Sequence, residues 1–408
     1  MTASRRVAVV GMGTKSPAGL SVGAAVETLR DGRGFAKRVG ILVDAQSSVQ
    51  IACVVEEYDL TPYLSTPFHR RNNRAALLAL SAATDAYRDS GLLGEEEERR
   101  TAVFVGTASG GLSIVDELTS AALEGRRALS PFTTTKIMAN SAAALISVRL
   151  GIRGSADTFV TACASGSTAL GEAYRRIRDG YADVALAGGV DAPVTPIIVE
   201  GFARTGALSL GREDVASTSR PFSIDRDGFV LGEGATFVVL EEWESARARG
   251  VRIVGEVLGY AANSDAFHVV KPLADGSMAG KCMSEAIADA RLTTADIGHI
   301  NAHGTGTILN DDAERCAIAR IFGRRIPVVA HKGVTGHMLG GSGAFEAALG
   351  IACTRNGFLP PIANLTPHQD ELVDLVDAER PVRAESVFLS NSFGFGGHNT
   401  VLVLRSVA

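Results

Sequence analysis

The sequence predicts an α/β protein in which strands and helices alternate as βαβ units. Apolar runs of strand length recur between helix-length segments, which is the first sign of this class. Hydrophobic residues make up 46% of the chain and charged residues 21%, as in ordinary globular proteins, and the 45 glycines are typical of many tight turns and close backbone contacts. A chain of 408 residues can bury a sizeable core, in two domains or in one large duplicated one.

The elements follow from the positions of these apolar runs. In the first half we expect strands at residues 7–11, 102–106, 158–161 and 184–188, and a helix at residues 74–90. In the second half we expect strands at residues 237–240, 251–259, 297–302, 387–390 and 401–404, and helices at residues 279–290 and 311–321. No sequence repeat is visible, and the polar stretches at residues 94–100 and 241–250 are predicted to be solvated helix faces or connections. We therefore expect one compact body.

Charge and cysteine usage argue against several classes of protein. The net charge of −5 provides no general attraction to nucleic acid or anionic lipid. The apolar run at residues 7–11 is too short for a signal sequence or a membrane span, so we expect a cytoplasmic protein that does not bind membranes. The five cysteines show no paired spacing, which argues against a disulfide framework and favours a single reactive thiol.

Cys163 is the strongest candidate nucleophile. It follows the β-branched run at residues 158–161 and precedes small residues and a helical stretch that ends near Gly180, so we expect its thiol at a strand-to-helix elbow. Unpaired N–H groups and the dipole at a helix start favour negative charge and can lower a thiol pKa from about 8.5 to roughly 3.5–7.5. The alternative is that Cys163 is one more small buried residue, as free cysteines often are.

A second candidate is His303, which ends an apolar run and precedes a glycine-rich segment at residues 304–307. The glycines allow a ligand to approach the backbone closely, and a neutral imidazole there could donate a hydrogen bond. His299 lies four residues earlier, but the intervening segment is a predicted strand, so we expect no metal site. A purely structural histidine is the alternative.

A third segment carries Lys332, His337 five residues later, and then a helical run that contains Glu346. A buried pair of Lys332 and Glu346 could orient His337. The surrounding glycines lack the order Gly-x-x-x-x-Gly-Lys-Ser/Thr of a phosphate loop, and the start of the chain lacks a full Gly-x-Gly-x-x-Gly. Nucleotide binding is therefore the weaker interpretation.

From residue 7 to residue 404 the chain resembles the elongating β-ketoacyl-acyl-carrier-protein synthases of the thiolase superfamily. The motifs that carry this resemblance occur in the family's order and spacing. They are Thr-Ala-Cys-Ala-Ser-Gly at 161–166, Arg-Pro-Phe-Ser-Ile-Asp-Arg-Asp-Gly-Phe at 220–229, Gly-Glu-Gly at 232–234, His-Gly-Thr-Gly-Thr at 303–307, Lys-x-x-x-Gly-His at 332–337 and Asn-Ser-Phe-Gly-Phe-Gly-Gly at 391–397.

The resemblance implies a thiolase-type fold, with two duplicated βαβ-rich halves in a layered α-β-α-β-α arrangement. Residues 1–250 would carry the nucleophile, and residues 251–408 both histidines. It implies a C–C bond-forming acyltransferase that performs decarboxylative Claisen condensation of an enzyme-bound acyl group with malonyl-acyl-carrier protein. No metal or redox cofactor is implied, since the substrates are carried on phosphopantetheine.

The resemblance also implies a role for each site residue. Cys163 accepts the acyl group, and His303 and His337 hold the malonyl thioester carbonyl so that the enolate forms against two fixed donors. The other implied roles are catalytic support by Lys332 with Glu346, oxyanion stabilisation and gating by Phe395, and pantetheine binding by Thr305 and Thr307.

The partner implied is an acidic acyl carrier protein, which the family binds through basic residues near the site mouth. The family also dimerises through its first half, so we expect a homodimer or a heterodimer with a chain-length factor. Arginines on a helix face are commonly plain solvated surface. The arginines in roughly corresponding regions are Arg70, Arg71, Arg74, Arg126, Arg127 and Arg204.

Two segments depart from the common family pattern. Gly154-Ser155-Ala156 replaces the frequent Gly-Pro-Asn, and residues 130–140 are polar where a fatty-acid enzyme often has apolar residues. These departures predict a specialised acyl chain in a polyketide or polyene pathway, with housekeeping fatty-acid elongation as the alternative. Cys163 argues against a non-catalytic subunit of the chain-length-factor kind. The paired histidines argue against a thiolase or an acyl hydrolase acting on coenzyme A esters.

Overall fold

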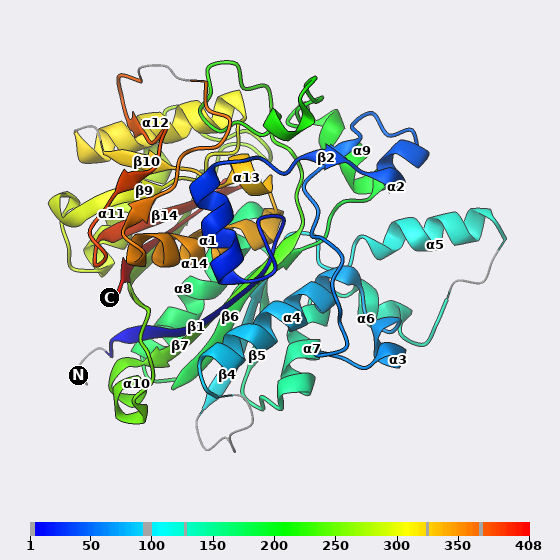
Figure 1. Cartoon of the computed structure of the whole chain (residues 1–408), viewed down its shortest axis with the longest axis horizontal. Helices are drawn as coiled ribbons and strands as arrows, with labels where there is room; N and C mark the ends of the chain where they lie inside the picture. The colour runs from blue at the N-terminus through cyan, green and yellow to red at the C-terminus, as the bar shows by residue number, and fades with distance from the viewer. Residues whose placement is uncertain (1–4, 93–99, 126–128, 324–325, 367–369) are drawn as a thin grey trace.

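The computed structural model describes residues 5–92, 100–125, 129–323, 326–366 and 370–408 (Figure 1). Its centre is a mixed sheet with the strand order β12-β10-β9-β14-β15-β8-β1-β7-β6-β4-β5. These strands are β1 Val7–Lys15, β4 Thr101–Gly106, β5 Ala156–Phe159, β6 Val184–Asp191, β7 Gly234–Glu242, β8 Gly255–Ser264, β9 Ile297–Asn301, β10 Pro327–Val329, β12 Asp374–Leu375, β14 Val387–Gly394 and β15 His398–Ser406. Two short ladders lie outside this sheet, β2 Lys37–Arg38 with β3 Ile51–Ala52 and β11 Phe358–Leu359 with β13 Arg380–Pro381.

The sheet contains the same five-stranded unit twice. One unit is β1-β7-β6-β4-β5 and the other is β8-β15-β14-β9-β10. If the five strands of each unit are counted in their order along the chain, the first strand pairs antiparallel with the fifth, and the fifth pairs antiparallel with the fourth. The second strand lies between the fourth and the third and is parallel to both. The units join where β1 pairs antiparallel with β8. The duplication implied by the family resemblance is therefore confirmed, although no sequence repeat is visible.

Fourteen helices are described, and none of the described helices is both long and apolar enough to cross a membrane. They are α1 Val22–Asp31, α2 Gly40–Asp44, α3 Thr66–His69, α4 Arg74–Asp89, α5 Ile114–Leu123, α6 Thr133–Ile137, α7 Ser141–Leu150, α8 Ser165–Arg178, α9 Pro196–Arg204, α10 Trp243–Arg249, α11 Ser277–Asp289, α12 Ile308–Phe322, α13 Lys332–Thr335 and α14 Ser342–Arg355.

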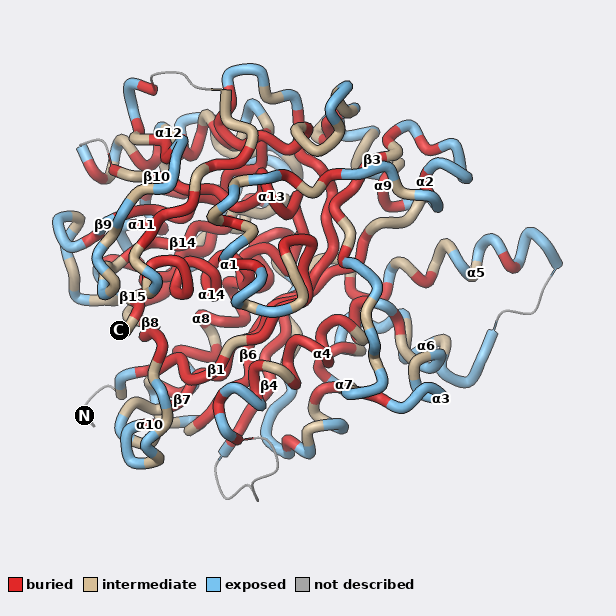
Figure 2. Tube along the Cα trace, in the orientation of Figure 1, coloured by how far each residue is buried: buried red, intermediate tan, exposed pale blue. Residues whose placement is uncertain are grey.

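The helices form three layers around the two units. Helices α8 and α14 pack on each other in the middle, α4 covers the outer face of the first unit with α7 beside it, and α11 covers the second unit with α12 beside it. In α14 every residue from Ser342 to Thr354 is buried, as expected of a helix that is apolar on all sides. Figure 2 shows the same concentration of buried residues in the sheet and the middle helices. This is the predicted α-β-α-β-α arrangement.

The predicted strands and helices are present, with some ends displaced. Strand β8 begins at Gly255 rather than at residue 251, because α10 ends in a left-handed cap at Gly250 and residues 251–254 connect the two elements. Two polar stretches were predicted to be helix faces or connections. The stretch at 241–250 contains helix α10, and residues 94–99 of the other stretch lie outside the described residues. The domain division at residue 250 stays a prediction, because both units share one sheet.

Strands β14 and β15 are longer than their apolar runs. Their antiparallel pairing continues through polar residues as far as Gly394 and His398. Because the backbone hydrogen bonds of a strand pair do not depend on side-chain polarity, the hairpin extends beyond the hydrophobic core. Its turn, residues 395–397, is thereby carried to the site described next.

Candidate active site

The nucleophile candidate sits at a sharp elbow between β5 and α8. A short 3-10 turn, Ala162–Ala164, joins the two, and Ala162 has a left-handed φ of 50°, which is unfavourable for a residue with a side chain. The Ser165 hydroxyl accepts from the Thr161 N–H at 2.9 Å and donates to the Ala162 carbonyl at 2.6 Å. The strained turn therefore holds the Cys163 thiol at the start of α8, as the sequence predicts.

The turn of the β14–β15 hairpin lies directly against this elbow. A Cβ atom on Gly394 would be 2.8 Å from the Thr161 carbonyl oxygen and 3.1 Å from the Cys163 nitrogen, so a larger residue would separate the two segments. The backbone N–H groups of Phe395 and of Cys163 itself act on the thiol and lower its pKa. Two main-chain donors thus converge on the sulfur.

The thiol pKa nevertheless departs from the sequence-based expectation. Burial raises the pKa of Cys163 to about 11, and the opposing effects of Lys332 and of the two backbone N–H groups are smaller. The physical reason is that Cys163 is 7% exposed in a cluster with apolar residues such as Ile198 and Leu339, where a thiolate loses its hydration. With a pKa raised in this way the thiol is protonated at pH 7, and its proton has to leave when a substrate is attacked.

His303 is held by the ammonium group of Lys332. The three protons of that ammonium point to the Glu346 carboxylate at 2.5 Å, to the His303 carbonyl oxygen at 2.5 Å and to His303 Nδ1 at 3.2 Å. Because an ammonium group cannot accept a hydrogen bond, His303 Nδ1 is the acceptor and Nε2 carries the ring proton. The predicted pair of Lys332 and Glu346 exists, but it orients His303 rather than His337.

His337 is oriented by a residue to which the sequence assigned no role, Ser342. The Ser342 hydroxyl accepts from the Met338 N–H at 2.9 Å and so directs its own proton to His337 Nδ1 at 3.1 Å. The Nε2 proton of His337 is thereby left to donate, and this atom has no partner within the part of the chain that the structure describes. The serine could have been recognised from its position five residues after His337.

The two imidazoles stand edge to face, with ring centroids 5.3 Å apart. Burial lowers the pKa of both histidines well below 6.5, and the nearby charge of Lys332 lowers it further. Both rings are therefore neutral at pH 7, and each presents one Nε2–H donor. Two neutral donors side by side are suited to a carbonyl oxygen on which negative charge develops.

Buried histidines should also make folding stability depend on pH. His299 and His331 have pKa values of about 3 because of burial, and those of His303 and His337 are lowered too. The unfolded chain protonates near pH 6.5 while the folded chain does not, so stability should fall as the pH drops below about 6.5.

Two buried glutamates act in the opposite direction. Burial raises the pKa of Glu314 and Glu346 to about 7, so the folded state binds their protons between about pH 4.5 and 7. Burial raises the pKa of the buried Asp191 and Asp311 as well, which also opposes the histidines. The unfolded chain takes up the protons of all four histidines over this range, and we expect the unfolding temperature to decrease between pH 6.5 and 5. Differential scanning calorimetry over this range tests the expectation, and a temperature that stays level would contradict it.

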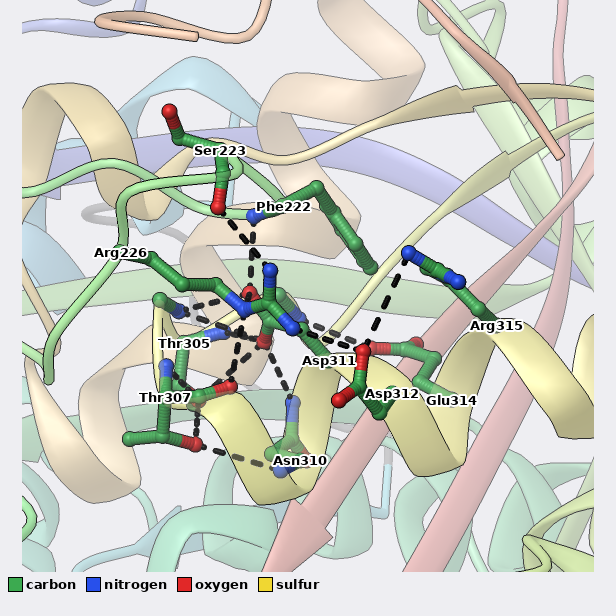
Figure 3. A network of polar contacts seen from close by, with 12 residues as sticks. Phe222, Ser223, Arg226, Thr305, Thr307, Asn310, Asp311, Asp312, Glu314 and Arg315 are labelled. Atoms are coloured by element: carbon green, nitrogen blue, oxygen red, sulfur yellow. Dashed lines mark hydrogen bonds and ion pairs between the residues drawn. The ribbon is translucent and has the colours of Figure 1, made fainter. Parts of the chain in front are cut away.

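The loop that carries His303 rests on two buried carboxylates of α12 (Figure 3). Glu314 accepts from the N–H groups of His303 and Gly304, both at 2.9 Å. Asp311 accepts from the Thr305 N–H at 3.0 Å and lies 3.7 Å from the Arg226 guanidinium. The sequence-based interpretation missed both carboxylates. Their signal was an acidic pair three residues apart, at the start of a helix that follows a glycine-rich loop.

A cavity of about 590 Å³ leads from the surface to Cys163. His303, His337, Thr305 and Thr307 all line it, and the two threonine hydroxyls bond each other at 2.9 Å. Phe395 lines it as well, with its ring 6.1 Å from that of Phe202. The structure thus brings the predicted site residues to one cavity, except Lys332 and Glu346, which lie behind His303. Among the described residues, no group of His, Cys, Asp or Glu side chains is arranged to hold a metal ion.

The arginines predicted to dock a carrier protein fall into three groups. Arg70 and Arg71 are exposed, and Arg204 is exposed next to Thr205 and Gly206 at the cavity wall. Arg74 is partly engaged within the protein, because its guanidinium is bonded to the buried Glu233 at 2.6 and 2.8 Å, and its role in docking stays a prediction. Arg126 and Arg127 lie outside the described residues.

A cysteine from one half of a duplicated fold that faces two histidines from the other half defines a thiolase-type condensing enzyme. The chain belongs to the beta-ketoacyl synthase family, whose N-terminal domain matches residues 4–246 and whose C-terminal domain matches residues 254–366. It is therefore an acyltransferase that forms carbon–carbon bonds.

Similar proteins include curated synthases and solved ketosynthase structures. The 3-oxoacyl-[acyl-carrier-protein] synthase 2 of Synechocystis sp. is 37% identical over 98% of both chains. The ishigamide ketosynthase/chain length factor structure matches with a TM-score of 0.91 and 34% identity over 100% of both chains. A type II polyketide synthase ketosynthase, solved with its acyl carrier protein and a bound hexaketide, matches with a TM-score of 0.89 and 28% identity over 99% of this chain and 100% of that one.

Proposed function

We propose that Cys163 is acylated by a carrier-bound thioester and that the acyl group is then condensed with malonyl-acyl-carrier protein. In the first step the Cys163 sulfur forms a bond to the acyl carbonyl carbon, the thioester C–S bond breaks, and the pantetheine thiol leaves with the proton. The observation that carries the proposal is that Cys163 shares one cavity with two neutral histidines whose Nε2–H groups are free to donate.

The backbone donors at the elbow support the acylation step. The N–H groups of Cys163 and Phe395 converge on the sulfur, so an oxyanion formed beside it would meet the same two donors. Removal of one donor of this kind typically costs about 2.7–4 kcal/mol of transition-state stabilisation. The close approach of Gly394 to Cys163 keeps these donors together.

The paired histidines support the second step. With the malonyl thioester oxygen between them, loss of CO₂ leaves an enolate whose charge faces His303 and His337 rather than water. The enolate carbon then bonds to the acyl carbonyl carbon, the C–S bond to Cys163 breaks, and the thiolate recovers a proton. This sequence uses no redox cofactor and no metal, because the substrates arrive activated as thioesters.

The cavity wall supports two further roles. Thr305 and Thr307 present hydroxyls along the path to Cys163, where a pantetheine arm has amide groups to bond. Phe395 is half-buried at a hairpin turn with positive φ at Gly396 and Gly397, so its ring can move without displacing a strand. We propose that the threonines bind pantetheine and that Phe395 gates the acyl chain.

An acyl carrier protein is the proposed partner, and Arg204 gives a direct test of where it docks. Charge reversal in Arg204→Glu should raise the KM for a carrier-bound substrate about 3- to 10-fold and leave kcat unchanged, because charges at an interface rim act mainly on encounter. Steady-state kinetics with acyl-carrier protein measure this. Arg247→Glu on α10, which does not line the cavity, is the matched control, and an equal effect of both variants would contradict docking at Arg204.

A second chain is proposed to cover the face formed by α5, α6 and α7. Strand β5 is the edge of the sheet here, and Figure 1 shows α5 projecting from the body on this side. An open edge and exposed apolar residues together favour association. The exposed apolar residues of this face are Leu112, Leu123, Leu129, Phe132, Ile137, Met138, Val148 and Val160.

The identity of the second chain is open to experiment. We expect sedimentation of the purified chain to show a homodimer, and a monomer that dimerises only with a co-expressed chain-length factor would establish the heterodimer instead. A monomer in both preparations would contradict the proposed interface. We place the protein in the cytoplasm, where malonyl-carrier substrates would be available to it.

The pathway is proposed as polyketide or polyene biosynthesis, with fatty-acid elongation as the second candidate. The exposed polar side chains of α6 favour the first, and the similarity to the curated 3-oxoacyl-[acyl-carrier-protein] synthase 2 favours the second. The test is intact-protein mass spectrometry after incubation with acyl carrier thioesters of different chain type and malonyl-carrier protein. Acyl-Cys163 followed by a β-ketoacyl product supports the function and ranks the substrates, whereas acylation with hydrolysis only would contradict the condensing role.

A further inference from the structure

The main chain of His337 belongs to a small ladder of three segments from distant parts of the sequence. The His337 N–H donates to the Val230 carbonyl at 2.7 Å, and the Gly232 N–H donates to the His337 carbonyl at 2.8 Å. On the other side of the same segment, the Cys53 N–H donates to the Leu231 carbonyl at 2.9 Å. The backbone position of His337 is therefore set by residues 230–232 and, through them, by residue 53.

The ladder is closed at one end by a buried ion pair. Glu233 continues the middle segment, and its N–H donates to the Cys53 carbonyl at 3.0 Å. Its carboxylate accepts Arg74 Nε at 2.8 Å and Arg74 Nη2 at 2.6 Å, together with the Val55 N–H at 3.0 Å. A two-pronged bond between a guanidinium and a carboxylate that is only 4% exposed is both strong and geometrically specific.

Little space is available for His337 to move independently of this ladder. A Cβ atom on Gly336 would lie 2.9 Å from the Cys53 sulfur and 2.9 Å from the Val230 carbonyl oxygen. The Phe229 ring stands edge to face against the His337 ring, with centroids 5.3 Å apart. A displacement of residues 229–233 would therefore be transmitted to the imidazole.

We propose that Glu233 and Arg74 are positioning residues for His337, and that their ion pair holds the ladder in the geometry that the malonyl step requires. This inference rests on the proposed function, because it assigns the malonyl step to His337. The other candidate role for Arg74 is contact with the carrier protein, since its side chain is 43% exposed at the start of α4. The two roles affect different kinetic quantities.

The test compares the two half-reactions of the full-length enzyme. Glu233→Gln keeps the shape of the side chain and an oxygen that can accept the hydrogen bond from the Val55 N–H. It removes the negative charge and so weakens the interaction with the Arg74 guanidinium. We expect CO₂ release from malonyl-carrier protein to slow about 10- to 100-fold, as for small misplacements of reacting groups. The rate at which Cys163 is acylated should stay the same, because acylation does not use His337. Arg74→Lys, which can still pair with Glu233, should recover part of the CO₂ release that Arg74→Met loses.

The control is a second buried Arg–Glu pair with similar geometry. Arg249 contacts Glu241 at 2.8 and 3.1 Å, and neither residue lines the cavity. Glu241→Gln should leave both half-reactions unchanged. The inference would be overturned if Glu233→Gln slowed CO₂ release and Cys163 acylation equally, or if Glu241→Gln slowed CO₂ release as much. Either result would mean that the pair of Glu233 and Arg74 contributes only to the stability of the fold. A raised KM with unchanged CO₂ release in Arg74→Met would assign Arg74 to docking. A wild-type enzyme that releases no CO₂ would contradict the proposed function instead.

Discussion

The variant Cys163→Ala should lose acyl transfer completely and lose condensation by about 10⁴-fold or more, because none of the other four cysteines lines the cavity. The thiol lies against the main-chain N–H groups of Phe395 and of Cys163 itself, which are the donors proposed for the oxyanion. The substitution removes one atom from a small buried side chain, and the protein should remain folded. Intact-protein mass spectrometry measures the acyl-enzyme, and product analysis measures condensation.

The same variant separates the two halves of the mechanism. His303 and His337 take their orientation from Lys332 and Ser342, not from the thiol. Cys163→Ala should therefore still release CO₂ from malonyl-carrier protein. Cys353→Ala, at a buried cysteine of α14 outside the cavity, is the matched control and should keep both activities. An acyl-enzyme that persists in Cys163→Ala would show that another residue is the nucleophile.

The variant Lys332→Met should have the second-largest effect, on both stability and rate. Its ammonium group is 1% exposed and makes three hydrogen bonds, and the methionine leaves the Glu346 carboxylate buried without its partner. Breaking a buried ion pair in this way costs about 3–5 kcal/mol of folding free energy. His303 also loses the donor that fixes its tautomer, so CO₂ release and condensation should fall about 10²- to 10³-fold, as for loss of one preorganised donor.

A double variant distinguishes the catalytic effect from the structural one. Adding Glu346→Gln to Lys332→Met removes the unpaired charge, so most of the unfolding free energy should return in chemical denaturation. The rate of CO₂ release should not return, because His303 Nδ1 still lacks its donor. Recovery of both quantities would mean that Lys332 contributes stability alone, and recovery of neither would mean that Glu346 has a function apart from its pairing with Lys332.

The motifs predicted from the sequence proved to be neighbours in space. More than a hundred residues separate Cys163 from His303 in the sequence, yet Cys163, His303 and His337 all line one cavity. Their local form was predictable because it depends on nearby residues. A β-branched run followed by small residues produces the elbow, and glycines allow close backbone contact beside each histidine.

Local patterns were insufficient where a partner comes from a distant part of the chain. Lys332 and Glu346 were expected to support His337, but Lys332, which is paired with Glu346, bonds to His303, 29 residues before it. Arg74 was expected to face a partner protein, and its ion pair with Glu233, 159 residues later, could not be foreseen from the residues around it. A low thiol pKa was expected from the start of α8 alone, but the apolar residues that bury Cys163 come from other segments and raise that pKa instead.

The sequence by itself determined the α/β class, the positions of the strands and helices, and the candidate nucleophile and histidines, because periodicity, turn residues and short motifs act over a few positions. The tertiary structure alone decided which charge faces which histidine, how two units without visible sequence similarity form one sheet, and how far burial shifts each pKa. Those properties depend on which distant segments the fold brings together and on the water that it excludes, and neither is encoded in residues that are adjacent in sequence.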